Sequence, residues 1–223
     1  ALLAADDRVQ TDAICWLDSD LLFLNNPHEL LLKPGEDFVG FPVEDKEMGT
    51  TGADDDPYEP IWRAFCRHLD IDINELPWVT TAETNERVRF YLNGGIFAYR
   101  KASGFARTYH DICLSLMDSN IGTSASDYNI GLKEMSAIGF AVVKLGLKWR
   151  ALPYSHDYVV SSYTHANWYR EEMLKQAVIV HYHDAMWPHF WPTFLECMQS
   201  THPAVAAWLE RLGPMRNKAA LHW

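Results

Sequence analysis

The sequence lacks the signatures of several common protein classes. Its four cysteines form no C-x-x-C pair, which argues against a zinc ribbon or a thioredoxin-like redox site. Each cysteine stands in an apolar context, as reduced core cysteines do, and this favours a reducing compartment. No apolar run reaches the roughly 18 residues of a membrane span, and no signal-peptide pattern is present. We therefore expect a soluble, cytoplasmic protein without an integral membrane span.

Basic residues are also scarce. Lysine and arginine total 19 against 30 aspartates and glutamates, for a formal charge of -11 at pH 7. This balance argues against sequence-independent binding to nucleic acid and against an anionic membrane surface. An acidic protein suits the gathering of divalent cations, although acidic surfaces also serve solubility. We expect no nucleic-acid partner.

Two aspartates one residue apart are the most informative feature that is present. Asp18 and Asp20 flank Ser19 between the apolar runs 14–17 and 21–23. Side chains two apart on a strand share a face, and a buried carboxylate is usually paired or bound to a metal. Two hard oxygen ligands suit Mg²⁺ or Mn²⁺. The alternative is an ordinary strand end with two solvated aspartates.

Hydrophobic periodicity predicts an α/β protein with a mixed sheet flanked by helices. A short helix capped by Asn26, with Pro27 in its first position, is also expected, and residues 44–57 read as a loop. No linker is evident, so we predict a single domain over residues 1–223. Strands are expected at 13–17, 38–43, 88–99, 140–145, 149–152 and 177–183; helices are expected at 58–69, 102–117, 126–137 and, at the carboxyl end, within about 192–212.

A late histidine extends the aspartate pair. His181 ends the predicted strand 177–183, and ligands of open α/β sheets bind outside the carboxyl ends of strands. Two carboxylates and one imidazole suit Mn²⁺ and leave positions for water or phosphate oxygens. His183 would lie on the same strand face and is the competing ligand. A purely structural role for His181 is the alternative.

Four segments in order resemble the GT-A glycosyltransferases, and family 8 in particular (the glycogenin and galactosyltransferase-like group). Residues 16–20 resemble the D-x-D strand of that family, and residues 91–97 its N-x-G segment. Residues 126–129 are similar to its D-Q-D block, and residues 180–188 to its closing H-x-x-G-x-x-K-P motif. The resemblance covers roughly residues 13–190, and its specificity lies in the ordered set.

The resemblance implies a GT-A-like fold and a retaining transfer of a sugar from a nucleotide-diphosphate donor to an acceptor hydroxyl. Asp18, Asp20 and His181 would hold Mn²⁺ (or Mg²⁺), which would bind the donor diphosphate. Asp127 would face the anomeric carbon, and Asn93 would border the sugar as the second catalytic candidate. The open alternatives are a helix cap for Asp127 and a turn residue for Asn93. The expected donor-binding residues are Ser19 near the ribose, Gly94, Gly95 and Trp187.

The sequence departs from the family pattern at several positions. Tyr128 replaces the family glutamine, Asp184 a glycine, and Trp187 the lysine that would touch diphosphate. The D-x-D strand also begins near residue 13, so we expect either an N-terminally truncated relative that lacks the nucleotide-binding portion or a reduced relative with a different donor pocket. A parallel sheet without its first strands would leave an open edge, which favours a homodimer.

Two other functions compete with the transferase. One is a noncatalytic GT-A-like remnant or carbohydrate-binding protein, which the departures at Asp184 and Trp187 favour. The other is a metal-dependent phosphoesterase that uses the same aspartates and histidine. It ranks lowest because the further histidine and aspartate clusters of a two-metal site are missing from the sequence.

Overall fold

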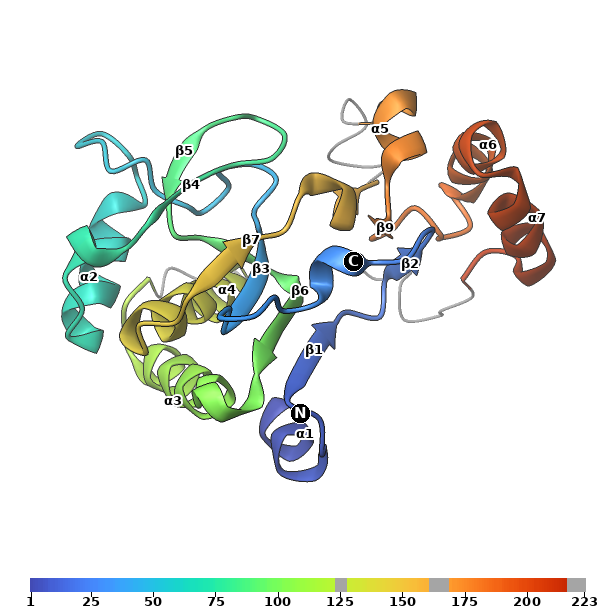
Figure 1. Cartoon of the computed structure of the whole chain (residues 1–223). Coiled ribbons are helices and arrows are strands. Elements are labelled where there is room, and N and C mark those ends of the chain that lie inside the picture. Colours follow the sequence, from blue (N-terminus) through green and yellow to red (C-terminus); the bar gives the residue numbers. More distant parts are fainter. Residues whose placement is uncertain (123–127, 161–168, 216–223) are drawn as a thin grey trace. The chain divides into compact units, whose positions relative to one another are not determined.

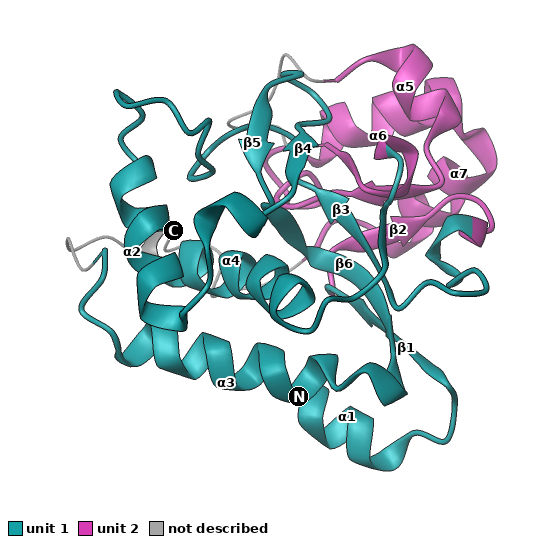
Figure 2. Cartoon of the chain, turned by 60° about the vertical axis from the view of Figure 1, so that its left-hand side comes forward, with its two compact units in different colours: residues 1–18, 29–153 teal, residues 19–28, 154–223 magenta. Residues whose placement is uncertain are grey.

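The computed structural model describes residues 1–122, 128–160 and 169–215 (Figure 1). The chain divides into two compact units, coloured separately in Figure 2. Unit 1 comprises Ala1–Asp18 and Glu29–Pro153, and unit 2 comprises Ser19–His28 and Tyr154–Trp223. Each unit has its own hydrophobic core. The single domain expected over 1–223 stays a prediction, because a division by contacts does not by itself define domains.

Unit 1 is built on a mixed four-stranded sheet, as predicted. The sheet order is β1 (Ala13–Leu17), β6 (Leu92–Arg100), β3 (Phe38–Pro42) and β7 (Trp149–Ala151). Strand β6 pairs antiparallel with both β1 and β3, and β3 runs parallel to β7. A separate hairpin joins β4 (Trp78–Thr80) to β5 (Arg87–Arg89). In the described part of the chain β1 is an edge strand, but its neighbour is antiparallel. The predicted homodimer stays a prediction.

Helices of unit 1 bury aromatic side chains against this sheet. The rings of Phe38 and Phe97 lie 5.8 Å apart, and that of Phe105 lies 5.6 Å from Phe97; all three are almost fully buried. Such rings supply much of the apolar area that stabilises a core. The helices of unit 1 are α1 (Leu2–Arg8), α2 (Glu59–Leu69), α3 (Phe105–Asp118) and α4 (Tyr128–Lys144), with 3-10 turns at His28–Leu30, Ile73–Glu75 and Lys101–Ser103.

Unit 2 combines a small mixed sheet with three helices. Strand β9 lies in the centre, antiparallel to β2 and parallel to β8. Leu174, Val180 and Leu209 are fully buried and anchor the core. The elements are β2 (Leu21–Phe23), the 3-10 turn Tyr154–His156, β8 (Tyr158–Val159), α5 (Glu171–Gln176), β9 (Ile179–His181), α6 (Trp191–Thr201) and α7 (Pro203–Leu212). The two predicted carboxyl-terminal helices are confirmed.

Several predicted elements are wrong or shifted. Residues 140–145 are not a strand but continue α4, because Ala137, Ile138 and Ala141 pack at helical spacing in a buried helix. The expected helix after Asn26 is only a 3-10 turn, and the expected strand 177–183 shortens to β9. Helix α1 and helix α5 were not predicted. Each described helix is too short or too polar to cross a membrane.

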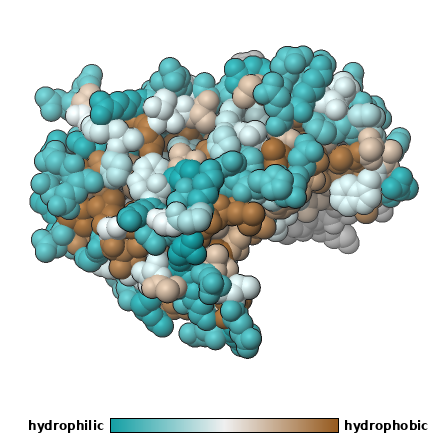
Figure 3. Space-filling model, in the orientation of Figure 1, coloured by the Kyte–Doolittle hydropathy of each residue, from teal (hydrophilic) through white to brown (hydrophobic). Residues whose placement is uncertain are grey.

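The face drawn in Figure 3 carries many hydrophilic residues with several apolar patches between them. Scattered apolar residues at a surface are ordinary and do not by themselves mark a binding site.

Two glycines of α4 test how closely this helix packs against the backbone at Phe90. A Cβ on Gly139 would lie 2.5 Å from the backbone oxygen of Phe90, whereas a Cβ on Gly131 would meet nothing within 4 Å. We predict that Gly139→Ala lowers the free energy of unfolding by about 1–3 kcal/mol through overpacking. Gly131→Ala should raise it by about 0.5–1 kcal/mol through helix propensity. Urea denaturation measures both, and equal effects at the two positions would contradict the described contact of α4 with residue 90.

Candidate functional site

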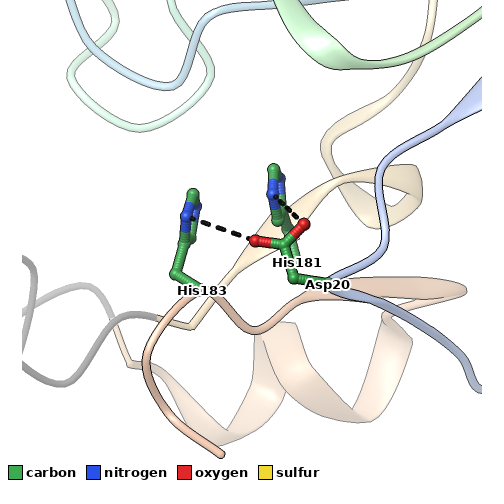
Figure 4. A group of neighbouring side chains, drawn as sticks. All are labelled: Asp20, His181 and His183. Atoms are coloured by element: carbon green, nitrogen blue, oxygen red, sulfur yellow. Dashed lines mark ion pairs between the residues drawn. The ribbon is translucent and has the colours of Figure 1, made fainter. Parts of the chain in front are cut away.

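One carboxylate and two imidazoles converge in unit 2 (Figure 4). Asp20, His181 and His183 each offer a ligand atom, and these atoms all lie within 4.8 Å of one another. Asp20 Oδ1 is 3.3 Å from His181 Nε2, and Asp20 Oδ2 is 3.9 Å from His183 Nδ1. Figure 4 shows the carboxylate directed at both rings. The two imidazoles stack with their centroids 4.0 Å apart.

Strand pairing positions this cluster. The register of β2 with β9 sets Leu21 opposite His181, and the Tyr182 amide donates to the Asp20 carbonyl at 3.0 Å. The Tyr182 hydroxyl also donates to the Ser19 carbonyl at 3.1 Å. His183 follows the strand with a φ of 42°, a left-handed conformation that is uncommon outside glycine. Backbone conformations of this kind cluster at functional sites.

A buried aspartate supports His181 from the other side. His181 Nδ1 lies 3.0 Å from Asp157 Oδ1, and both side chains are almost inaccessible to water. Burial alone would lower the pKa of His181, but hydrogen bonds to Asp157 and Asp20 outweigh it and raise the pKa to about 10. Burial raises the pKa of Asp157 despite its bond to His181. Burial of Asp20 also opposes ionisation, but the two histidines lower its pKa overall.

The donor set fits a divalent transition metal. Carboxylates suit hard cations such as Mg²⁺ and Mn²⁺, whereas imidazole suits transition metals better than Mg²⁺. Two imidazoles with one carboxylate therefore fit a divalent transition metal better than Mg²⁺ in this cluster. The sequence predicted Asp20 and His181 as ligands with His183 as a competitor, and the structure brings all three together.

The remaining residues of the first two motifs meet in unit 1. Pairing of β1 with β6 lets the Asp18 amide donate to the Gly95 carbonyl at 2.9 Å. The Trp16 indole donates to Asp18 Oδ1 at 3.2 Å. Asn93 is buried, where its Oδ1 accepts from the Gly95 amide at 2.7 Å and its Nδ2 donates to Glu44 at 3.3 Å. These contacts order the N-x-G segment beside Asp18, whose role as a ligand stays a prediction.

Three other predicted site residues stand as follows. Ser19 is exposed in unit 2, directly before Asp20. Trp187 is half-buried in the turn region after β9, where its amide donates to the Asp184 carbonyl at 2.8 Å. Asp127 lies outside the described residues, so its predicted role as a catalytic residue is not tested.

Sequence reasoning missed a carboxylate next to the N-x-G segment. Glu134 of α4 accepts a hydrogen bond from the Tyr109 hydroxyl at 2.8 Å. A Cβ on Gly94 would lie 3.2 Å from Glu134 Oε2, so glycine allows the close approach. Burial raises the pKa of Glu134, and the charge of Asp18 raises it further. Its signal in the sequence is the charged pair Lys133 and Glu134 inside the mainly apolar stretch 130–143.

Glu134 also lines a cavity of unit 1. The cavity measures about 450 Å³ and lies among α1, α3, α4 and the sheet, with Trp16 and Phe97 in its wall. Most of its lining is apolar, and pockets of about this volume with a few polar groups commonly hold small ligands.

Comparison with known proteins identifies the family. The model of the Rhodobacterales glycosyltransferase domain matches residues 2–128. The chain belongs to this glycosyltransferase family. The match includes residues 16–20 and 91–97, and it confirms the predicted glycosyltransferase relationship. Membership of family 8 stays a prediction.

Solved structures of glycosyltransferases are also similar to the chain. Apo mouse xyloside xylosyltransferase 1 aligns with a TM-score of 0.39 and 13% identity, over 81% of this chain and 62% of that one. The apo bifunctional glycosyltransferase WbbM aligns with a TM-score of 0.43 and 13% identity, over 89% of this chain and 34% of that one. The chain thus spans less than two thirds of either structure. No curated protein matches the sequence significantly.

The environment of Glu134 makes a pH-dependent prediction. Because burial raises its pKa in the folded protein, the ionised carboxylate opposes folding above the pKa of the unfolded chain. In metal-free buffer Glu134→Gln should therefore raise the melting temperature at about pH 7. The gain should disappear below about pH 4, where the carboxyl is protonated in both states.

Glu36 is a matched control of opposite sign. Its bond to Arg150, 2.8 Å long, lowers its pKa, so Glu36→Gln should lower the melting temperature at neutral pH. That loss should also shrink in acid. If both variants shift the melt in the same direction at neutral pH, the described environment of Glu134 is wrong.

Proposed function

We propose that the protein is a metal-dependent glycosyltransferase that moves a sugar from a nucleotide-diphosphate donor to a hydroxyl of a carbohydrate acceptor. The family assignment supports transfer of a sugar. The observation that carries the metal dependence is the convergence of Asp20, His181 and His183. Retention of anomeric configuration is part of the proposal and follows from the resemblance to family 8.

Each member of the cluster has a proposed role. Asp20 offers the one carboxylate, and His181 and His183 offer one nitrogen each toward the same point. A divalent cation bound there would supply neutralisation of the charge that develops on the leaving diphosphate. His181 is held on both sides and is the fixed ligand. His183, whose side chain is 37% exposed, is the adaptable one. Asp18 remains a proposed additional ligand.

Residues of the N-x-G segment would form the sugar border. The hydrogen bond from Gly95 to Asn93 orders this segment, and the lack of a side chain at Gly94 lets the Glu134 carboxylate lie close to its backbone. We propose that Asn93, Gly94 and Gly95 contact the donor sugar, that Ser19 lies near the ribose, and that Trp187 contacts the donor. Asp127 is the proposed residue at the anomeric carbon.

A noncatalytic remnant is the second candidate. Asp184 and Trp187 stand where the family pattern has a glycine and a diphosphate-binding lysine. Loss of a charge-assisted contact of that kind costs about 1.5–3 kcal/mol. A remnant could keep the metal cluster and a carbohydrate-binding surface while no longer holding the donor.

The metal cluster is tested by calorimetric titration with Mn²⁺. Asp20→Asn should abolish measurable binding while the thermal melt stays within a few degrees, because it removes the only carboxylate of the set. The control is Glu196→Gln, which changes an exposed carboxylate of α6 in the same unit. His181→Ala should weaken binding more than His183→Ala. Unchanged Mn²⁺ affinity of Asp20→Asn would refute the assignment.

The donor is tested on the Mn²⁺-loaded protein with a panel of UDP- and GDP-sugars. We expect heat for at least one donor and slow hydrolysis or transfer of its sugar. Dependence of both signals on Mn²⁺ would link them to the cluster. A folded, Mn²⁺-binding sample that gives no heat with any donor would support the remnant instead.

A further inference from the structure

We propose that Asp157 is a positioning residue of the metal centre. It accepts the Nδ1–H of His181 and thereby presents the Nε2 lone pair of that imidazole to the cation. The proposal rests on the metal site of the proposed function and adds a residue that belongs to none of the four motifs.

The geometry of His181 carries the first step. Its Nδ1 lies 3.0 Å from Asp157 Oδ1, and its Nε2 lies 3.3 Å from Asp20 Oδ1. The two ring nitrogens therefore face two different carboxylates. An ionised carboxylate only accepts hydrogen bonds, so Asp157 requires a proton on Nδ1. A metal-binding imidazole is neutral and uses one nitrogen as the ligand, which leaves Nε2 for the cation next to Asp20.

The burial of Asp157 argues against a role in stability alone. The side chain is fully buried, and among the described residues its Oδ2 has no hydrogen-bond partner. An isolated buried carboxylate is costly, and replacing a buried ion pair with apolar residues often stabilises a protein. His181 is its one hydrogen-bonding side chain in the described structure. The arrangement is explained if its function is to orient His181.

Local structure holds Asp157 in place. The Asp157 amide donates to the Tyr154 carbonyl at 3.1 Å, at the end of the 3-10 turn. Three residues later the Val160 amide donates to the His181 carbonyl at 2.9 Å, within the pairing of β8 with β9. On the other side of Asp157 the Val178 amide donates to the Ser155 carbonyl, so the two backbone segments are joined both before and after the contact of their side chains. Such support fixes a ligand ring before the metal binds.

For the neutral imidazole, the hydrogen bond to Asp157 favours the Nδ1–H tautomer over the Nε2–H tautomer. The Nε2–H tautomer would keep its proton between His181 and Asp20, and it would thus occupy the nitrogen and the carboxylate that the cation needs. Loss of an outer hydrogen-bond partner of a metal ligand typically weakens metal affinity 10–100-fold. We expect a change in this range for Asp157→Asn, since the amide keeps the size of the side chain but can donate to Nδ1 as readily as accept from it.

Tyr158→Phe is the structural control. The Tyr158 hydroxyl accepts from the Arg170 amide at 2.9 Å, and its ring is fully buried beside Asp157. This variant should lower the melt of unit 2 while leaving Mn²⁺ affinity within about twofold. Calorimetric Mn²⁺ titration of the wild type, Asp157→Asn and Tyr158→Phe compares the effects directly. Equal Mn²⁺ affinity in Asp157→Asn and the wild type would overturn the proposal.

A second measurement needs no variant. Nitrogen NMR of the histidine-labelled wild-type protein, loaded with diamagnetic Zn²⁺, should show His181 bound through Nε2 and protonated on Nδ1. Binding through Nδ1 would overturn the positioning role even if Asp157→Asn failed to fold. If the wild type binds neither metal, the metal site of the proposed function fails as well. If His181 binds the metal through Nε2 but Asp157→Asn leaves the Mn²⁺ affinity unchanged, only the role of Asp157 is wrong and the metal site stands.

Discussion

Pairing of β2 with β9 is the constraint on which the candidate metal centre depends. Two segments from opposite ends of the chain meet in this register, so that Asp20 lies against His181 and the Tyr182 amide closes the ladder. The three side chains of the cluster, Asp20, His181 and His183, all belong to unit 2. The same strand β9 pairs on its other side with β8, which follows Asp157. A three-stranded sheet thus carries both carboxylates that face His181.

The charges around His181 would favour a bound cation. Asp20 and Asp157 flank one imidazole, and a second imidazole stacks on it. Two stacked imidazoles would repel each other if both were protonated, whereas neutral rings around a divalent ion would not. A cation would bind the ligand atoms and leave the Asp157 bond intact. In unit 1 another acidic side chain, Glu134, lies next to the N-x-G segment, which belongs to the part of the chain that matches the family.

The sequence predicted the mixed α/β fold and the candidate ligands better than the exact helices and strands. Alternating strand and helix patterns located β1, α2 and β7, and the mixed sheet follows from them. Asp20 and His181 were proposed as metal ligands because each follows an apolar run, where a carboxylate is usually paired or bound to a metal; a structural role stayed open for both. The strand predicted at residues 140–145 is wrong because a short apolar run fits a buried helix as well as a strand.

Asp157 and Glu134 could not be found in this way, because their significance comes from long-range contacts. Asp157 is one aspartate before a short strand, and only pairing of β8 with β9 brings it to His181. Glu134 stands next to Lys133 in a mainly apolar helix, and only the packing of α4 beside Gly94 reveals its site. The stacking of His183 depends on a left-handed backbone angle, for which a non-glycine residue gives no sequence signal.

Pulsed electron paramagnetic resonance of the Mn²⁺-loaded protein tests directly whether His181 and His183 bind one cation together with Asp20. Coupling of the manganese electron spin to nitrogen nuclei reports how many imidazoles are ligands. We expect coupling to two histidine nitrogens in the wild type, and ¹⁵N-histidine labelling identifies them. A spectrum without nitrogen coupling, as hydrated Mn²⁺ gives, would contradict the metal centre.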